Sequence, residues 1–426
     1  MQIGGTLFLA LLILTSSAAA QTPTTLYTFT GGADGTGPNT VAIGAGGVLY
    51  GTTGGAGTAG YGTAFSLTPP ISAGGPWTVS YYSFPGGDEE FPSSGPLAIA
   101  SGGSLLFGVG AYVNYSNNGS IYELIPPASP DAAWTQKVLD EFTSAESAEP
   151  SNPNSVIVAS GPSGGLVLYG TSRFGGHAGG NGFGTVFSVT PPAVPGGHWT
   201  ETVLYTFQGP PNDGEEPTAN VLAGSGGVLY GTTAYGGTNN SGTVFLLTPP
   251  SSPGGTWTET VLYSFPQAFA GCGAGQLIQP DARGVLYGVA STCGHGHNDH
   301  GMVFSLTPPA SPGGEWRPEM LHRFTAGSTD GENPNSLLEY HGVLYGTTGG
   351  PGAGYHSNGY GTIFSLAPPS SEGGSWTETV LYFFTNGSDG GYPTGIVVGP
   401  GGVFYGSTHT GGSGFGTVFS FTPQAS

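Results

Sequence analysis

A repeat of about 60 residues runs through almost the whole chain and limits the folds that it can adopt. The heptapeptide GVLYGTT occurs at residues 47–53, 227–233 and 342–348. Aligning its aromatic residue with related segments gives seven copies, spaced 57 to 62 residues apart, at Tyr50, Phe107, Tyr169, Tyr230, Tyr287, Tyr345 and Tyr405. A period of this length indicates repeated units that bury their apolar faces against one another.

Each copy contains four short segments with the signals of β-strands. In one copy they read NVLAG (220–224), VLYGTT (228–233), TVFLLT (243–248) and TVLYSF (260–265). These segments alternate in polarity, are rich in β-branched and aromatic residues, and are bounded by glycine or proline. We find no window with useful helical periodicity, so the chain is predicted to be all-β.

Seven units of four strands predict a seven-bladed β-propeller, in which each blade is a four-stranded antiparallel sheet. The chain opens with TTLYTF at residues 24–29, a copy of the fourth segment, and that segment is absent after GTVFSFTP at 416–423. We therefore expect the N-terminal strand to join the last blade and close the ring. A ring of eight blades and an open solenoid are alternatives, although solenoids typically use shorter units.

The combined pattern LYGTT…GG…GTVFSLTP…GG.WTETVLYSF extends over residues 24–423. It resembles the GloVer-type tandem repeat of exported bacterial proteins, a family with variable, choice-of-anchor surface attachments. The resemblance implies an extracellular or surface repeat protein of undefined activity. The sequence stops at Ser426, three residues after the last repeat, so we expect no anchor segment here.

The N-terminal residues have most features of a secretory signal peptide. Residues 6–15 form a short apolar run and Ala18–Ala20 provide small residues before a cleavage site, although a basic start is missing. We predict a signal peptide over 1–20 and a single propeller over 24–426. The protein is then secreted, periplasmic or on the cell surface, with no transmembrane segment after cleavage. A buried N-terminal strand or helix is the alternative.

The charge balance limits the partners. The chain has 25 acidic and 5 basic residues, a net charge of −20. Nucleic acids and anionic lipid surfaces need clustered Lys and Arg, so we exclude both. An extracellular glycan or protein remains a plausible partner, and we expect a monomer.

Two cysteines and one histidine-rich loop are candidates for covalent or metal chemistry. Export favours a disulfide between Cys272 and Cys293, with two unpaired thiols as the alternative. The loop CGHGHNDHG at 293–301 is a candidate site for Zn, Ni or Cu; it contains His295, His297, Asp299 and His300. Its spacing matches no closed zinc motif, and a solvated polar loop is the alternative.

Asp-Gly turns followed by proline recur between the units and bring carboxylates to one face. Asp213, Asp330 and Asp389 are candidate ligands for Ca²⁺, which prefers oxygen donors. The alternative is turn chemistry, with each Asp accepting backbone hydrogen bonds. Aromatic and imidazole side chains of the same face form a candidate surface for sugars, unless they pack on their own blades: His177, Tyr235, His356, Tyr360 and His409.

Catalytic motifs are weak. GPSGG at 161–165 fits G-x-S-x-G, but no helix is expected after it, and no set of catalytic residues can be selected. The sequence favours a non-catalytic scaffold for a glycan, protein or matrix ligand. A secreted polysaccharide hydrolase or lyase, using loop carboxylates as acid and base, is the alternative. A structural ring without a ligand is the third reading, so enzymatic activity stays open, with Ca²⁺ or a transition metal as the only cofactors to consider.

Overall fold

The computed structural model describes a chain built from short strands, with almost no helix. It describes residues 21–424 except 73, 87–90, 93–94, 101–102, 104, 112–117, 128–131, 143–148, 162–163, 177–181, 195, 253, 267–273, 292–299, 312, 326–329, 351–358 and 372. The predicted signal peptide, 1–20, therefore lies outside the described residues. Among the described residues, short 3₁₀ turns accompany the strands: η1 (Ala45–Gly47), η2 (Ser225–Gly227) and η4 (Pro400–Gly402). Within the described residues no helix has the length and apolarity to cross a membrane.

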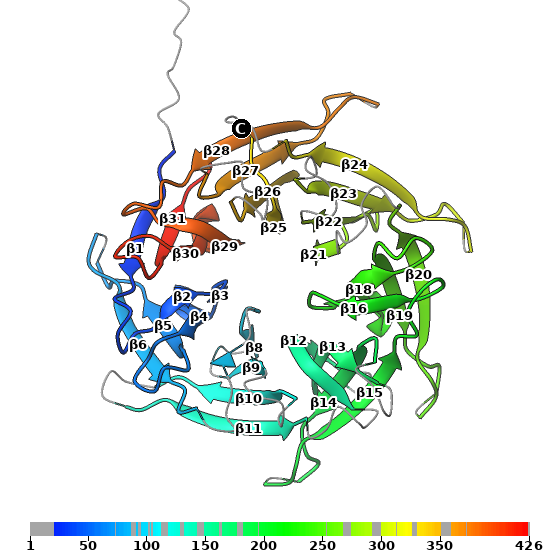
Figure 1. The fold of residues 1–426 in the computed structure, drawn as a ribbon, viewed down its shortest axis with the longest axis horizontal. Coiled ribbons are helices and arrows are strands. Elements are labelled where there is room, and N and C mark those ends of the chain that lie inside the picture. Colours follow the sequence, from blue (N-terminus) through cyan, green and yellow to red (C-terminus); the bar gives the residue numbers. More distant parts are fainter. Residues whose placement is uncertain are drawn as a thin grey trace, which may run out of the picture.

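Seven antiparallel sheets are arranged around a central opening, which confirms the predicted seven-bladed propeller (Figure 1). Blade 1 contains β2 (Thr36–Pro38), β3 (Ala42–Ile43), β4 (Leu49–Gly55), β5 (Thr63–Thr68) and β6 (Thr78–Ser83). Blade 2 contains β7 (Phe91–Pro92), β8 (Ala98–Ile99), β9 (Leu106–Ala111), β10 (Ser120–Ile125) and β11 (Thr135–Glu141). Blade 3 contains β12 (Pro150–Ser160), β13 (Leu166–Gly175), β14 (Thr185–Thr190) and β15 (Thr200–Thr206).

The remaining blades follow the same order from the centre outward. Blade 4 contains β16 (Gly214–Pro217), β17 (Leu222–Ala223), β18 (Leu229–Gly236), β19 (Thr243–Thr248) and β20 (Thr258–Ser264). Blade 5 contains β21 (Ala274–Ile278), β22 (Leu286–Ala290), β23 (Met302–Thr307) and β24 (Arg317–Arg323). Blade 6 contains β25 (Pro334–Tyr340), β26 (Val343–Thr348), β27 (Thr362–Ala367) and β28 (Thr377–Phe383). Blade 7 contains β29 (Gly391–Val398), β30 (Phe404–Thr410), β31 (Thr417–Phe421) and, pairing antiparallel with β31 as its outermost strand, β1 (Thr24–Thr28).

The innermost strand differs from the expectation in one respect. The Asp-Gly-x-x-Pro segment was expected to be a turn that precedes this strand. In blade 4 it already pairs with the next strand, Gly214 opposite Gly236 and Pro217 opposite Thr233. The innermost strand is therefore split into β16 and β17. A proline is tolerated there because this strand is an edge of its sheet.

Three residues of the repeated GVLYGTT segment, the second glycine and the two threonines, have different structural roles. Its glycine leaves room for a phenylalanine of the next strand, since a Cβ on Gly231 would lie 2.3 Å from the Phe245 ring. Its first threonine reaches the next blade, where the Thr232 hydroxyl donates to the Gly275 carbonyl at 3.0 Å. Its second threonine stays within the blade, with the hydroxyls of Thr233 and Thr243 2.8 Å apart.

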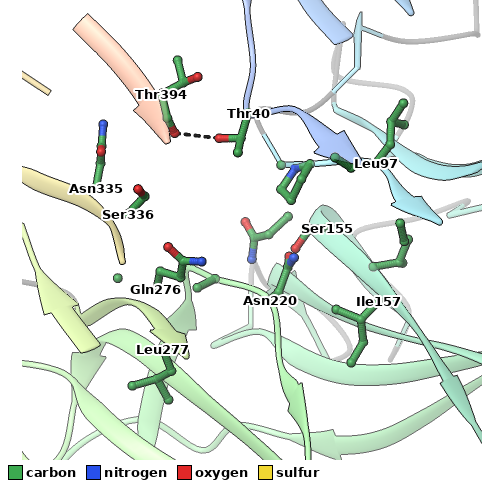
Figure 2. Close-up of a pocket in the computed structure, with 18 of the residues that line it drawn as sticks. Thr40, Leu97, Ser155, Ile157, Asn220, Gln276, Leu277, Asn335, Ser336 and Thr394 are labelled. Atoms are coloured by element: carbon green, nitrogen blue, oxygen red, sulfur yellow. Dashed lines mark hydrogen bonds between the residues drawn. The ribbon is translucent and has the colours of Figure 1, made fainter. Parts of the chain in front are cut away.

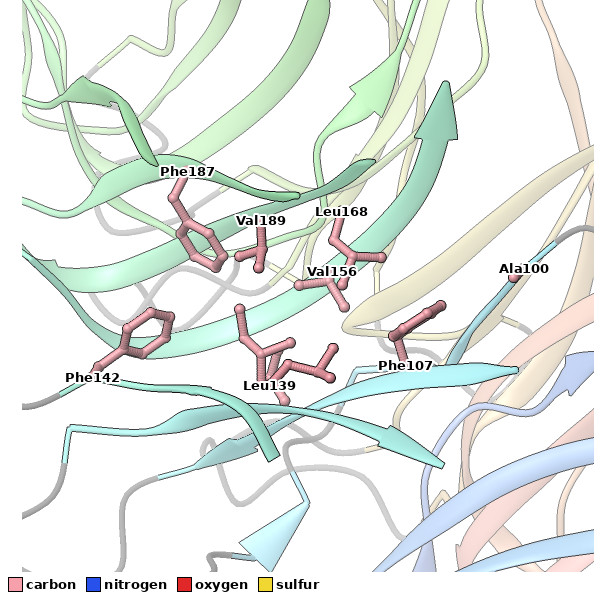
Figure 3. Packing of buried hydrophobic residues seen from close by; sticks show 10 residues of the cluster. Ala100, Phe107, Leu139, Phe142, Val156, Leu168, Phe187 and Val189 are labelled. Carbon is pink, nitrogen blue, oxygen red and sulfur yellow. The ribbon is translucent and has the colours of Figure 1, made fainter. Parts of the chain in front are cut away.

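Apolar side chains pack between neighbouring sheets. Figure 3 shows one such layer, in which Phe107 and Phe142 of blade 2 lie with Val156, Leu168 and Phe187 of blade 3. Phe142, Leu168 and Phe187 are almost completely buried. Because every blade forms such a layer with its neighbours, burial of the apolar faces holds the ring together.

The tryptophans lie between blades as well. Trp257, just before β20, packs edge-on against Tyr169 of blade 3, with ring centroids 6.3 Å apart. Trp376 packs in the same way against Tyr287 of blade 5, at 6.1 Å. Each thus fills the space beside the aromatic residue of the preceding copy, and this shared partner explains why tryptophan recurs at one repeat position.

A second contact joins the loops of neighbouring blades. In blade 4, Glu216 adopts a left-handed conformation, with φ 53°, and its N–H donates to the Phe183 carbonyl of blade 3 at 2.9 Å. Its neighbour Pro217 packs on Gly184, where a Cβ would lie 2.5 Å from the proline Cδ. Blades 6 and 7 repeat this glycine–proline clamp with Gly361 and Pro393.

Candidate functional site: the central channel

The innermost strands of the blades line a central cavity of about 950 Å³. Figure 2 shows polar side chains that line this cavity, and the Thr40 hydroxyl donates to the Thr394 carbonyl at 2.6 Å. Aliphatic residues, among them Ile43, Ile157 and Val397, also line the wall. A cavity with an apolar wall and a few converging polar groups is typical of a small-ligand site.

Besides Asn152 and several hydroxyl residues, one carboxamide from each of four consecutive blades lines the cavity. We call these four the amide arc; they are Asn154, Asn220, Gln276 and Asn335. Two of them join blades, since Asn154 Nδ2 donates to the Pro217 carbonyl at 2.6 Å and Asn335 Nδ2 donates to the Pro393 carbonyl at 2.7 Å. These two amides are fixed by the architecture of the ring.

The other two amides keep hydrogen-bonding capacity for a ligand. Gln276 Oε1 accepts from the Leu337 N–H at 3.0 Å, and within the described part of the chain its Nε2 donates to no other group. The Asn220 carboxamide likewise has no hydrogen bond to another described residue. Both side chains line the cavity and offer donors, and Asn220 also offers an acceptor.

Arg173 is the single charged residue among the described residues that line the cavity. Its guanidinium lies 2.8 Å from Glu216 of blade 4, and its side chain is half exposed. An exposed pair of this kind contributes little to stability. Because Glu216 offsets the charge of Arg173, the cavity wall is close to neutral.

The aspartates of the Asp-Gly turns face their own loops. Asp213 accepts hydrogen bonds from the Gln208 N–H at 2.8 Å, the Gly214 N–H at 2.6 Å and the Tyr205 hydroxyl at 2.7 Å. Asp389 accepts from the Thr385 N–H at 2.7 Å and from the Tyr382 hydroxyl at 3.0 Å. This is the hydrogen bonding that a turn aspartate provides, and calcium binding at these residues stays a prediction.

The pKa values of Asp389 and Asp330 reflect hydrogen bonds of this kind. Burial alone raises the pKa of Asp389, but hydrogen bonds from Thr385 and Tyr382 outweigh burial and hold that pKa below its usual range. For Asp330, burial is likewise outweighed by donors that include His322 and Thr325. The carboxylates are therefore stabilised in their charged form.

The other candidates from the sequence lie in different places. His300 Nδ1 is 2.9 Å from a carboxylate oxygen of Glu332 in the next blade. Tyr360 packs edge-on against Tyr392, with centroids 5.7 Å apart, while Tyr235 lies on β18 and His409 is exposed on β30. None of these residues lines the cavity described above. Outside the described residues lie His177, Cys272, Cys293, His295, His297, Asp299 and His356.

A glutamate near the start of three outermost strands faces the preceding blade. Burial, followed by the charge of Asp213, raises the pKa of Glu259 to about 8. Burial also raises the pKa values of Glu201 and Glu378 to about 7, with smaller contributions from nearby acids. These junctions thus favour protonated carboxyls near neutral pH.

We expect the melting temperature to fall as the pH rises from about 5 to 8. The folded chain keeps a proton on Glu259 in this range, whereas the unfolded glutamate, with its ordinary value of 4.5, has released it. Glu259→Gln should gain roughly 1–2 kcal/mol over wild type at pH 8, after discounting for solvent screening. The exposed Glu315→Gln is the control. If the melting temperatures of Glu259→Gln and Glu315→Gln fell equally between about pH 5 and pH 8, the proton on Glu259 would not be the cause of the pH dependence.

The sequence analysis missed the amide arc. The available signal was an asparagine directly after proline in two copies, Pro153-Asn154 and Pro334-Asn335. A residue next to proline is usually predicted to lie in a loop. Only the closed ring shows that these asparagines line the same cavity.

The fold and its cavity define a seven-bladed β-propeller with a nearly neutral central cavity lined by aliphatic and amide side chains. The chain belongs to the Gloeobacter/Verrucomicrobia repeat family, whose model matches residues 133–355. This confirms the predicted repeat family, while the choice-of-anchor attachment and the export that the resemblance implied stay predictions. No curated protein matches the chain.

Three solved structures are similar to this chain, and the first of them, with a TM-score above 0.5, supports the fold. The β-propeller domain of Myceliophteria thermophila Cps50 (Swd1) is 10% identical with a TM-score of 0.52, covering 95% of this chain and 100% of that one. The periplasmic gluconolactonase PpgL of Pseudomonas aeruginosa is 15% identical with a TM-score of 0.49, covering 81% and 84%. A glucose dehydrogenase is 12% identical with a TM-score of 0.45, covering 79% and 98%. At these identities the likeness concerns the fold alone.

Proposed function

We propose that the protein is a non-catalytic binding propeller, secreted or held at the cell surface, that takes a neutral, hydroxyl-rich ligand such as an oligosaccharide at the amide arc. One observation carries this proposal. The Asn220 carboxamide and the Gln276 Nε2 group line a cavity of about 950 Å³ without a partner among the described residues. Amides offer donors and acceptors together, which matches the hydroxyl groups of a sugar.

The charge distribution supports a neutral ligand. The chain carries a net charge of −20, which repels anions at long range. Arg173 at the cavity is already paired with Glu216. Aliphatic wall residues such as Ile157 and Val397 provide an apolar surface for the C–H faces of a sugar ring.

Polysaccharide cleavage, the alternative expected from the sequence, needs two carboxyl groups across the substrate. The described residues of the cavity wall include no such pair. The turn carboxylates of Asp213 and Asp389 are engaged by donors of their own loops. These contacts favour binding over cleavage.

Binding is tested by screening the full chain against neutral oligosaccharides and titrating the best by calorimetry. Asn220→Ala and Gln276→Ala should each weaken binding about 5- to 10-fold, the loss of one hydrogen bond. Gln279→Ala, an exposed amide three residues from Gln276 that does not line the cavity, should bind as wild type. If the oligosaccharides were recovered from the protein in shortened form, polysaccharide cleavage would be favoured over binding. Failure of every neutral glycan, or unchanged binding by both variants, would refute the proposal.

A further inference from the structure

One junction between blades has a histidine beside the turn aspartate, at a repeat position that is tyrosine in most copies. In three junctions a tyrosine two residues before the buried phenylalanine donates its hydroxyl to this aspartate: Tyr27 to Asp34 at 2.9 Å, Tyr205 to Asp213 at 2.7 Å and Tyr382 to Asp389 at 3.0 Å. Between blades 5 and 6 the same position on β24 holds His322. Its Nε2 lies 3.4 Å from Asp330 Oδ1.

A third group reaches this junction from the next blade. Glu378, on β28, brings its carboxylate to the same place, and its buried Oε1 has no hydrogen-bond partner. One ligand atom of each residue, His322, Asp330 and Glu378, lies within 4.8 Å of the other two. It is the one such group of three His, Cys, Asp or Glu side chains found among the residues that the structure describes.

We propose that His322, Asp330 and Glu378 form a binding site for a divalent transition-metal ion of the Zn²⁺ type, which links the outermost strands of blades 5 and 6. One imidazole and two carboxylates are a donor set that suits Zn²⁺ better than Ca²⁺, which prefers oxygen ligands only. The separation of Nε2 and Oδ1, 3.4 Å, fits two ligands of one tetrahedral ion. Ligands about 2.0–2.1 Å from zinc lie about 3.4 Å apart at a tetrahedral angle.

Access and charge are consistent with an ion at this junction. The side chains of His322 and Asp330 are 21% and 10% exposed, so an ion and a water as fourth ligand can enter. A bound cation offsets the repulsion between the two carboxylates.

The junction between blades 3 and 4 is a natural comparison. Tyr205, Asp213 and Glu259 occupy the corresponding positions, and Glu259 Oε1 is also buried without a hydrogen-bond partner. Burial, the hydrogen bond to Asp213 and nearby charges raise the pKa of Tyr205, which keeps its phenol protonated. A protonated phenol is a poor zinc ligand, so His322 is the substitution that makes a site of this junction.

Zinc binding is tested by dialysing the full chain to equilibrium with Zn²⁺ and counting bound ions, with affinity from competition against a chromophoric chelator. His322→Tyr introduces the residue that most copies of the repeat have at this position, so the variant should fold normally. This variant should bind one equivalent of Zn²⁺ fewer than wild type, or bind that equivalent with an affinity at least about tenfold lower. Glu378→Gln should weaken the same equivalent, and Zn²⁺ should raise the melting temperature of wild type more than that of either variant.

A variant that acquires a Zn²⁺ site tests the proposal more sharply than variants that lose one. Tyr205→His, which recreates the trio with Asp213 and Glu259, should add one equivalent of Zn²⁺. His409→Ala, which removes an exposed imidazole elsewhere, should leave the count unchanged. Ions held by the loop at 293–301 would persist in all these variants and so are counted separately. The proposal is overturned if His322→Tyr and Glu378→Gln both bind Zn²⁺ as wild type does.

Discussion

Replacing Gly184 by alanine should lower the free energy of unfolding by roughly 3–5 kcal/mol. Gly184 has φ +95°, a conformation that alanine adopts at a cost. A Cβ there would lie 2.5 Å from Cδ of Pro217 in the next blade and 2.6 Å from the Ser172 carbonyl oxygen in its own blade. Both neighbours belong to the ordered backbone or a rigid ring, so neither can move away cheaply. Chemical denaturation of both proteins measures the difference.

A matched variant separates the cost of the positive φ angle from the cost of the steric contact with Pro217. Gly196 has φ +82° but no heavy atom within 4 Å of a built Cβ. Gly196→Ala should therefore cost only about 1–2 kcal/mol. Gly361→Ala, where the Cβ would meet Pro393 Cδ at 2.4 Å, should repeat the loss seen at Gly184. Equal effects at Gly184 and Gly196 would show that the clamp between blades is unimportant.

Much of the fold could be predicted because the signals repeat. Polarity alternation identifies a strand weakly in one copy, but seven aligned copies give its period and bounds. The role of individual letters in GVLYGTT was beyond the sequence. Thr232 bonds to the next blade and Thr233 to its own, and only the stacked sheets distinguish the two.

The candidate sites were harder to predict, for a physical reason. A turn aspartate and a metal-binding aspartate look the same in a sequence, since the donors that occupy Asp213 are mostly backbone N–H groups. The junction with His322 joins residues 56 positions apart, His322 and Glu378, through the packing of two blades. Its signal was a departure from the repeat, LHRF at 321–324, where five of the other six copies have tyrosine at the second position and the copy at 139–142 has aspartate. Comparing the copies position by position would have found it.

Removing residues 21–30 should destabilise the protein by more than the roughly 3–5 kcal/mol expected for deleting one buried phenylalanine side chain. The truncation removes β1, which pairs with β31 from Thr24 opposite Ser420 to Thr28 opposite Thr417. It also removes Phe29, which is fully buried and packs edge-on against Phe65 of blade 1 at 5.2 Å. The junction of blades 7 and 1 thus loses apolar contact, and β31 becomes an exposed edge prone to association.

A circular rearrangement distinguishes loss of the strand from loss of the N-terminus. Residues 24–30 would be moved to follow Thr422 through a copy of residues 249–257, the connection that blade 4 uses between β19 and β20. This chain should melt at least as high as the wild type, because the copied segment also supplies a tryptophan, which the last blade lacks in the native order. Thermal melting and size-exclusion chromatography follow both chains. A truncated chain that stays monomeric and melts at the wild-type temperature would mean that the pairing of β1 with β31 contributes little, and that stacking between blades alone holds the ring.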